Sequence, residues 1–248
     1  MEDITIHLPV MADKVVEYLV REKKGIYVDA TLGCGGHSLA ILQNSDASVI
    51  GFDLDKEQIE IASERLREFS ERVLFVNANY KEMDKILDEK VDGVLFDFGF
   101  SSYQLDNPKR GFSYRNDGPL DMRFGRSGTT AGEIIENSSE EEIADILYFY
   151  GGERVSRRIA KKIKTEKPRT TGELALLVRK SVPRAKAHKH LGRVFQAFRI
   201  AVNEEFRSIE NGILAAAQVL KGKGRIIAIT YHKDEEKIVC KKAKEEDL

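Results

Sequence analysis

The stretch from Tyr27 to Ser38, YVDATLGCGGHS, decides the fold of this chain. It contains an apolar run that ends in Asp29, a glycine-rich turn, and a segment that begins a helix. Glycines let a ligand approach backbone N–H groups closely, and a helix N-terminus carries partial positive charge. A second apolar run ends in Asp53, twenty residues after Gly33, where an acid can accept the hydroxyls of a ribose. The first third of the chain is therefore predicted to bind a small molecule that carries a nucleoside.

Two ligands fit such a loop, and the residues favour S-adenosylmethionine over NAD. A dinucleotide fingerprint has a glycine at its sixth position, but that position, counted from Gly33, is Ser38. Asp29 would repel the pyrophosphate of a dinucleotide, whereas it suits the cationic sulfonium and ammonium groups of S-adenosylmethionine. An NAD-dependent oxidoreductase, and a glycine-rich turn that binds nothing, remain the alternatives.

The composition indicates a globular chain with one large domain or two small ones. The 248 residues are 42% hydrophobic and 33% charged. No apolar run is long enough for a membrane span and the first residues lack a signal-peptide pattern, so no membrane partner is expected. Cys34 and Cys240 are the only cysteines, which favours a reducing, cytoplasmic setting. The scattered histidines, with only His188 and His190 close together, predict no metal site.

The charge of the chain is small overall but strongly segregated. The net charge is −1, yet residues 151–200 contain fifteen Lys and Arg against three Asp and Glu, a local charge of +12. Such segregation is typical of a protein with a polyanionic partner, and a solvated helical face is the alternative. We therefore expect nucleic acid to bind this region.

Alternating strands and helices predict a parallel sheet with helices on both faces. The expected strands cover residues 26–30, 48–53, 73–77 and 91–96. Ligands of such sheets bind at the carboxyl ends of the strands. Polar residues fall at or just beyond these ends: Asp29, Asp53, Tyr80 and Asp97. Their convergence is a stronger signal than any one of them.

The alternation breaks after Asp97. Residues 98–130 are rich in turn formers, and helical patterns follow before a single long helix is expected over 192–220. A final strand is expected over 225–231. The sequence thus predicts an α/β fold in which a mostly helical insertion, over about 105–190, separates the fourth and fifth strands.

Four segments resemble the RsmH/MraW family of methyltransferases, which act on N4 of a cytidine in bacterial 16S ribosomal RNA. They are DATLGCGGHS at 29–38, FDFGFSSYQLD at 96–106, RGFSYRNDGPLDMR at 110–123 and VFQAFRIAVNEE at 194–205. The similarity runs in order from His7 to about Val239. It implies N4-methylation of a cytidine in the decoding region, with S-adenosylmethionine as cofactor and the small ribosomal subunit as partner.

The resemblance also implies a fold and a cofactor site. The fold is a Rossmann-like class I methyltransferase, with a cofactor-binding domain at 1–104 and 191–240 and an RNA-recognition insertion at 105–190. The expected cofactor-binding residues are Gly33, Gly35, Gly36, His37, Asp53, Tyr80, Asp97 and Gln104. The strand ends had already indicated Asp53, Tyr80 and Asp97, whereas Gln104 and the target base come from the resemblance alone.

The expected catalytic residues are Asp97 and Asn203. The N4 lone pair of cytosine is delocalised into the ring, so positioning and acceptors for its protons should provide much of the catalysis. Asp97 follows the fourth strand, where it, or a nearby carbonyl, can orient the amine. Phe98 or Phe100 could stack on an extruded base, and ordinary packing is the alternative.

Basic and polar residues of the insertion are the expected RNA contacts. They are Arg110, Arg115, Asp121, Arg123, Arg154, Arg157, Arg158 and Lys161. Structural salt bridges are the alternative for the first four, and a solvated helix face for the last four. A non-catalytic ribosome assembly factor with a relic cofactor pocket, and a paralogue with another RNA target, also remain open. The sequence leaves the oligomeric state open, a homodimer included.

Overall fold

The computed structural model describes residues 9–248, and these divide into two compact units. One unit ends at Ser101 and resumes over Phe206–Leu248, and the other is Ser102–Glu205. The expectations that fall on residues 1–8 lie outside the described part of the chain. Within residues 9–248, no helix combines the length and the apolar character that crossing a bilayer requires.

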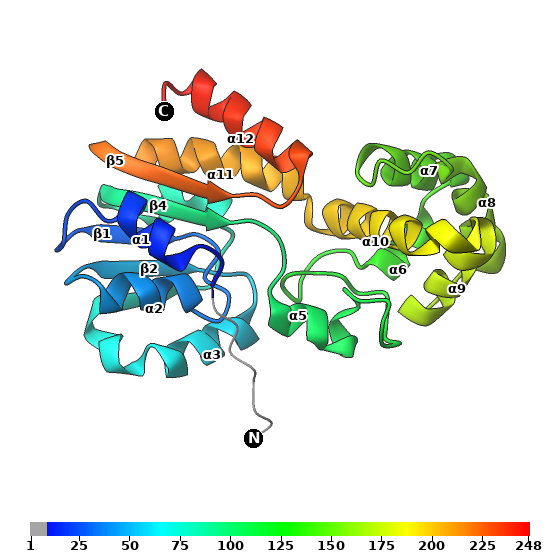
Figure 1. Cartoon of the computed structure of the whole chain (residues 1–248), viewed down its shortest axis with the longest axis horizontal. Coiled ribbons are helices and arrows are strands. Elements are labelled where there is room, and N and C mark those ends of the chain that lie inside the picture. Colours follow the sequence, from blue (N-terminus) through cyan, green and yellow to red (C-terminus); the bar gives the residue numbers. More distant parts are fainter. Residues whose placement is uncertain (1–8) are drawn as a thin grey trace. The chain divides into compact units, whose positions relative to one another are not determined.

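The first unit contains a sheet of five parallel strands in the order β3-β2-β1-β4-β5 (Figure 1). The strands are β1 Ile26–Asp29, β2 Ser48–Phe52, β3 Val73–Val76, β4 Val91–Asp97 and β5 Leu220–Ile229. From β1 the chain adds β2 and β3 on one side and then returns to add β4 and β5 on the other side of β1. Ligands of α/β sheets bind at the carboxyl ends of the strands beside such a switch point. The predicted Rossmann-like sheet, with an insertion between the fourth and fifth strands, is confirmed.

Helices cover both faces of this sheet because neighbouring strand residues point to opposite faces. These helices are α1 Ala12–Leu19, α2 Gly36–Gln43, α3 Lys56–Arg65, α4 Met83–Ile86, α11 Glu205–Val219 and α12 Lys233–Glu245. On β4, Leu95 belongs to the core formed with α1 and α2. Its neighbours Val94 and Phe96 belong to the core formed with α11. Because the five strands are parallel, the loops that follow them lie at one edge of this sheet.

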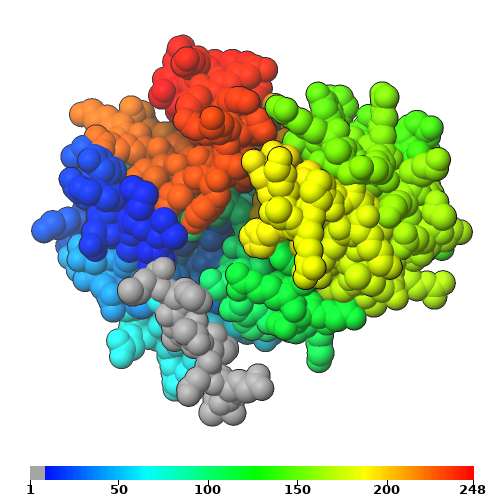
Figure 2. Space-filling model, turned by 45° about the vertical axis from the view of Figure 1, so that its right-hand side comes forward, coloured from blue at the N-terminus to red at the C-terminus, as the bar shows by residue number. Residues whose placement is uncertain are grey.

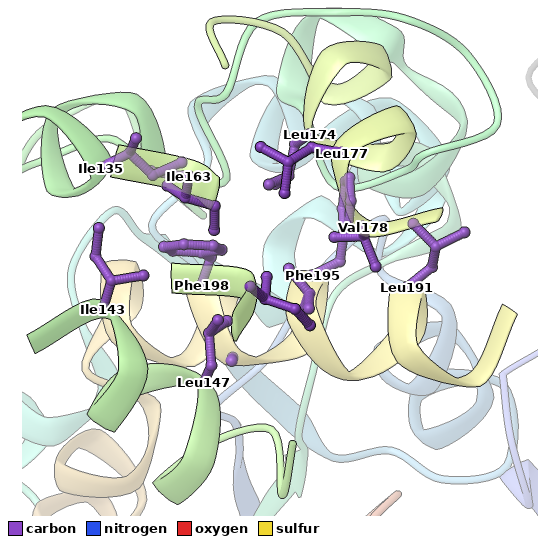
Figure 3. Packing of buried hydrophobic residues seen from close by; sticks show 14 of the residues in the cluster. Ile135, Ile143, Leu147, Ile163, Leu174, Leu177, Val178, Leu191, Phe195 and Phe198 are labelled. Carbon is purple, nitrogen blue, oxygen red and sulfur yellow. The ribbon is translucent and has the colours of Figure 1, made fainter. Parts of the chain in front are cut away.

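The second unit is a cluster of helices around its own apolar core. Its helices are α5 Ser102–Asp106, α6 Ala131–Asn137, α7 Glu140–Phe149, α8 Ser156–Glu166, α9 Thr171–Ser181 and α10 Ala187–Asn203. Figure 3 shows Phe198 of α10 among Ile135, Ile143, Leu147 and Ile163, which α6, α7 and α8 contribute. The central position of α10 explains its apolar face.

The single helix expected over 192–220 is wrong, because the chain breaks at Glu204. Glu204 has a left-handed conformation with φ 46°, which ends α10 before α11 begins at Glu205. An ion pair spans this break: Arg199 donates from Nε and Nη2 to the two carboxylate oxygens of Glu205, at 2.7 and 3.0 Å. The apolar spacing continues across this break, so periodicity could not reveal it.

The boundary of the helical unit also differs from the expected one at residue 190. Residues 191–203 pack in the helical unit, since Leu191, Val194 and Phe195 lie in its core. The last strand differs too: it starts at Leu220 rather than 225, because the glycine-rich stretch is part of β5. A register shift opposite Val91 accommodates that stretch.

Candidate active site

The glycine-rich loop after β1 is fixed to the end of β2 by Asp53. One carboxylate oxygen of Asp53 accepts from the N–H of Gly33, and the other accepts from the N–H of Asp55, both at 2.8 Å. Gly33 and Gly35 have φ values of 53° and 76°, a region that side chains rarely adopt. No side chain caps the N-terminus of α2. The loop therefore presents backbone N–H groups beside a carboxylate.

The pKa of Asp53 is shifted by its surroundings. Burial raises the pKa of Asp53 to about 6, although the two backbone N–H groups that it binds act in the opposite direction. The carboxylate is therefore mostly ionised at neutral pH and titrates just below it. An ionised carboxylate in this position can accept hydrogen bonds from hydroxyl groups of a ligand.

Asp97, at the end of β4, is held by residues from three other elements. His37 Nε2 lies 3.3 Å from Asp97 Oδ2, and the Tyr231 hydroxyl donates to Asp97 Oδ1 at 2.9 Å. The Asp97 N–H donates to Thr31 Oγ1 at 2.7 Å. The Asp97 side chain is still 22% exposed, so a ligand can reach a carboxylate whose orientation is already fixed.

Tyr231 follows β5 and was not identified from the sequence. Desolvation by neighbouring atoms and the Asp97 charge raise the pKa of Tyr231 above its usual range although the residue is 59% exposed, so its hydroxyl is a donor at neutral pH. A Cβ added to Gly99 would lie 3.9 Å from the Tyr231 ring, which places the ring beside the turn after Asp97. Its place at the end of the strand expected over 225–231 is the signal that could have identified it.

Two buried polar atoms near the loop lack a hydrogen-bond partner. Ser38 Oγ donates to Asp29 Oδ2 at 2.7 Å, but Asp29 Oδ1 and His37 Nδ1 have no such partner within residues 9–248. Burial raises the pKa of Asp29. Burial alone would lower the pKa of His37, but the Asp97 hydrogen bond and the charges of Asp29 and Asp97 outweigh it and raise that pKa. The carboxyl groups of Asp29 and Asp97 thus lie close to a single histidine.

An aromatic cluster lies beside the acids. The half-buried ring of Tyr80 meets Phe96 edge-on, with centroids 5.4 Å apart. Phe98 stacks on Phe96 at 5.2 Å and is only 3% exposed, so it packs in the core and the base-stacking alternative for it is not supported. Phe100 is 37% exposed. A Cβ added to Gly212 of α11 would lie 2.6 Å from the Tyr80 ring, so this glycine makes room for the ring.

Residues expected at the site but lying in the helical unit make framework contacts. Gln104 is buried and donates to the carbonyl of Phe124 at 3.3 Å. Asn203 accepts from the Phe124 N–H at 2.7 Å and donates to the Met122 carbonyl at 2.8 Å. Arg110 is 1% exposed and donates to the Phe124 carbonyl. These contacts hold the segment around Phe124 in place.

Asp121 and Arg123 form a two-pronged ion pair with distances of 2.8 and 2.9 Å, which favours the structural salt bridge that the sequence left open. Arg123 also donates to the carbonyls of Arg126 and Gly128. In contrast, the other expected RNA contacts are exposed: Arg115, Arg154, Arg157, Arg158 and Lys161. Buried Arg110 and exposed Arg115 could not be told apart by sequence, because both occur in the same polar, turn-rich segment.

A parallel sheet of this order, with a glycine-rich loop after β1 and acids at the ends of β1, β2 and β4, defines a Rossmann-like α/β methyltransferase. Residues 4–247 match the model of the MraW methylase family, and the chain belongs to this family.

The chain is similar to curated members from several bacteria. It is 43% identical over 244 residues to ribosomal RNA small subunit methyltransferase H of Carboxydothermus hydrogenoformans, covering 94% of this chain and 78% of that protein. It is 44% identical over 247 residues to the protein of the same name from Geotalea uraniireducens, covering 94% of this chain and 79% of that protein. The similarity therefore spans both units.

Proposed function

We propose that this methylase transfers a methyl group from S-adenosylmethionine to N4 of a cytidine in the decoding region of 16S ribosomal RNA. Family membership and the name of its relatives support S-adenosylmethionine-dependent methylation of small-subunit ribosomal RNA. The single observation that carries the choice of an amine acceptor is Asp97, an accessible carboxylate held in one orientation at the end of β4. The proposed reaction takes place in the cytoplasm, where small subunits assemble.

The residues of the sheet unit fit the cofactor. Asp53 would accept the ribose hydroxyls, and the half-buried Tyr80 ring would stack on the adenine. Fixed Asp97 would supply negative charge for the ammonium and sulfonium groups, and the buried Asp29 Oδ1, which has no partner within residues 9–248, would be a further acceptor. Gly33, Gly35, Gly36 and His37 line the turn, and Gln104 is the cofactor contact proposed from the helical unit. When bound, the cofactor supplies an electrophilic methyl group.

The protein's part in the reaction is to position a weak nucleophile, the N4 amine of cytosine. Asp97 accepts a hydrogen bond from an N4 proton, which turns the amine toward the methyl group and favours loss of that proton as the new bond forms. His37, Tyr231 and Thr31 fix the carboxylate and the start of the turn beforehand, so little reorganisation is needed during the reaction. Phe100, exposed beside Asp97, offers a surface for the base.

The helical unit is proposed to bind the RNA. Its exposed cations Arg115, Arg154, Arg157, Arg158 and Lys161 would contact phosphates. Arg110, Asp121, Arg123 and Asn203 would act through the shape of the segment around residue 124, since their polar groups bind the protein itself. Asn203 is therefore proposed to position this segment rather than to take part in the reaction directly.

Mass mapping of 16S ribosomal RNA tests the proposal. Small subunits from a strain that lacks the enzyme are incubated with the purified protein and isotopically labelled S-adenosylmethionine, and the RNA is then digested and sequenced by mass. The expected result is one labelled methyl group on N4 of a cytidine in the decoding region. A label on another atom or another region contradicts the target. Absence of any label, with binding to the subunit retained, favours the assembly-factor alternative.

A further inference from the structure

Two adjacent aromatic side chains are exposed at the end of α7. Tyr148 and Phe149 are 54% and 66% exposed, and their rings lie edge-to-face with centroids 5.2 Å apart. The opposite face of α7, with Ile143 and Leu147, is buried in the core of the helical unit. Since aromatic side chains are normally at least partly covered, this pair is a candidate contact surface rather than part of the core.

The neighbouring helix α8 carries a row of cations. Arg157, Arg158 and Lys161 of α8 are exposed on the side opposite the buried Ile159, Ala160 and Ile163, and exposed Arg154 lies in the turn just before the helix. Within residues 9–248, none of these four cations has a carboxylate partner or a side-chain hydrogen bond. By contrast, exposed Lys237 of α12 pairs with Asp234 at 2.9 Å. The row is thus free to bind an external anion.

The short connection between α7 and α8 brings the aromatic pair and the cations to the same end of this helical hairpin. Only residues 150–155 join α7 to α8, and the helices pack against each other (Figure 1). The connection is anchored because buried Glu153 accepts from the Val155 N–H at 3.0 Å and lies 2.7 Å from His190 Nδ1. Figure 2 shows residues 140–166 in yellow-green among the surface helices. We call Tyr148, Phe149 and the four cations the hairpin surface.

We propose that the hairpin surface binds unpaired RNA, with phosphates on the cations and bases stacked on Tyr148 and Phe149. Successive aromatic rings beside a basic groove are the usual means of holding single-stranded nucleic acid, because every base has a face that can stack. A duplex would offer phosphates to the cations but keep its bases stacked inside the helix. The inference rests on the proposed RNA substrate and adds that the segment held here is single-stranded.

The absence of tryptophan from the chain provides a direct probe of stacking. The variant Phe149→Trp has one tryptophan at the proposed platform, and Tyr18→Trp has one at the 51% exposed Tyr18 of α1 as a matched control. A short single-stranded RNA oligonucleotide should quench the emission of Phe149→Trp and leave that of Tyr18→Trp unchanged. The same strand annealed to its complement should quench Phe149→Trp far less.

Affinity measurements separate the aromatic from the ionic contribution. Tyr148→Ala/Phe149→Ala should weaken binding of the single strand roughly tenfold or more without changing the salt dependence. Arg157→Gln/Arg158→Gln should instead reduce the slope of log affinity against log salt by about 1.4. Leu176→Ala, which removes a 51% exposed apolar side chain from α9 of the same unit, should change neither quantity.

The outcomes distinguish this inference from the proposed function. If Phe149→Trp is not quenched and the double alanine variant binds like the wild type, stacking is refuted, although the charge variant and methylation can still behave as proposed. Quenching of Phe149→Trp by purified small-subunit proteins but not by RNA would also overturn it in favour of a protein partner. If the wild type methylates no small-subunit RNA, the proposed function fails first.

Discussion

The carboxylate of Asp97 lies between partners from two separate elements, His37 at the start of α2 and Tyr231 after β5. A carboxyl group on a single strand end could rotate about its side-chain bonds, but contacts to both oxygens leave it one orientation. The carboxylate proposed to accept a hydrogen bond from the amine therefore already has its orientation before substrate binds. The sequence indicated Asp97 from its place at a strand end, but it could not indicate partners that only the folded sheet brings together.

Tyr231→Phe tests this arrangement by removing the hydroxyl and keeping the ring. We expect the turnover number to fall about tenfold, since one hydrogen bond to a charged group is lost, while the KM for S-adenosylmethionine changes little. Steady-state kinetics on small subunits measure both values. Tyr18→Phe is the matched control, and a wild-type turnover number in Tyr231→Phe would remove Tyr231 from the arrangement.

The pKa of Asp53, raised by burial to about 6, predicts how cofactor binding depends on pH. The ionised carboxylate is the better acceptor for ribose hydroxyls, and protonation removes its charge as the pH falls through 6. The affinity for S-adenosylmethionine should therefore be constant above about pH 7 and fall by up to tenfold per pH unit below about pH 6. Calorimetry across this range measures it.

Asp53→Asn separates this effect from the titration of His37. The variant should bind more weakly at pH 7.5 and lose most of the decline at low pH. If Asp53→Asn keeps the full decline, another group is responsible for the pH dependence.

Among the elements, α11 shapes the site through a glycine. Gly212 lies against the Tyr80 ring, and an added Cβ would be 2.6 Å from two ring carbons. Gly212→Ala should therefore displace the ring and weaken binding of S-adenosylmethionine at least about fivefold, with an overpacking cost of about 1–3 kcal/mol in stability. Calorimetry and chemical denaturation measure the two effects.

The matched control is Gly192→Ala on α10, where no neighbouring atom lies within 4 Å of the added Cβ. Because alanine favours a helix over glycine, this variant should be more stable by about 0.5–1 kcal/mol and bind the cofactor normally. Unchanged cofactor affinity in Gly212→Ala would show that Tyr80 does not depend on the space beside α11.

The elements also show how far sequence reasoning extends. The first four strands were predicted to within two residues, because buried parallel strands are short apolar runs that end in polar residues. The break at Glu204 was missed because both helices keep the same apolar spacing and the left-handed residue is not a glycine. Local patterns describe each segment, but the packing of α10 in the helical core decides where it ends.

At the scale of the whole molecule, the expected site residues divide between the units. Those of the glycine-rich loop and the strand ends meet in the sheet unit, as the rule for parallel sheets predicts. Arg110, Asp121, Arg123 and Asn203 bind the framework of the helical unit instead. A polar residue in a turn-rich segment can serve a ligand or the backbone, and only the folded positions of its partners decide which.

The charged residues divide between the two units in the same way. The excess of cations in residues 151–200 falls wholly within the helical unit, while the acids Asp29, Asp53 and Asp97 belong to the sheet unit. In the proposed function, the first unit provides carboxylates for a cationic methyl donor and the second provides positive charge for RNA. This separation of acidic and basic residues between the two units is the physical basis of the proposed function.

Single-turnover methyl transfer by Asp97→Ala, measured beside its affinity for S-adenosylmethionine, tests the central claim most directly. If Asp97 orients the amine, cofactor binding should weaken by no more than about tenfold while the transfer rate on small subunits falls at least about a thousandfold. A wild-type transfer rate in Asp97→Ala, with the protein folded and the cofactor bound, would contradict the account.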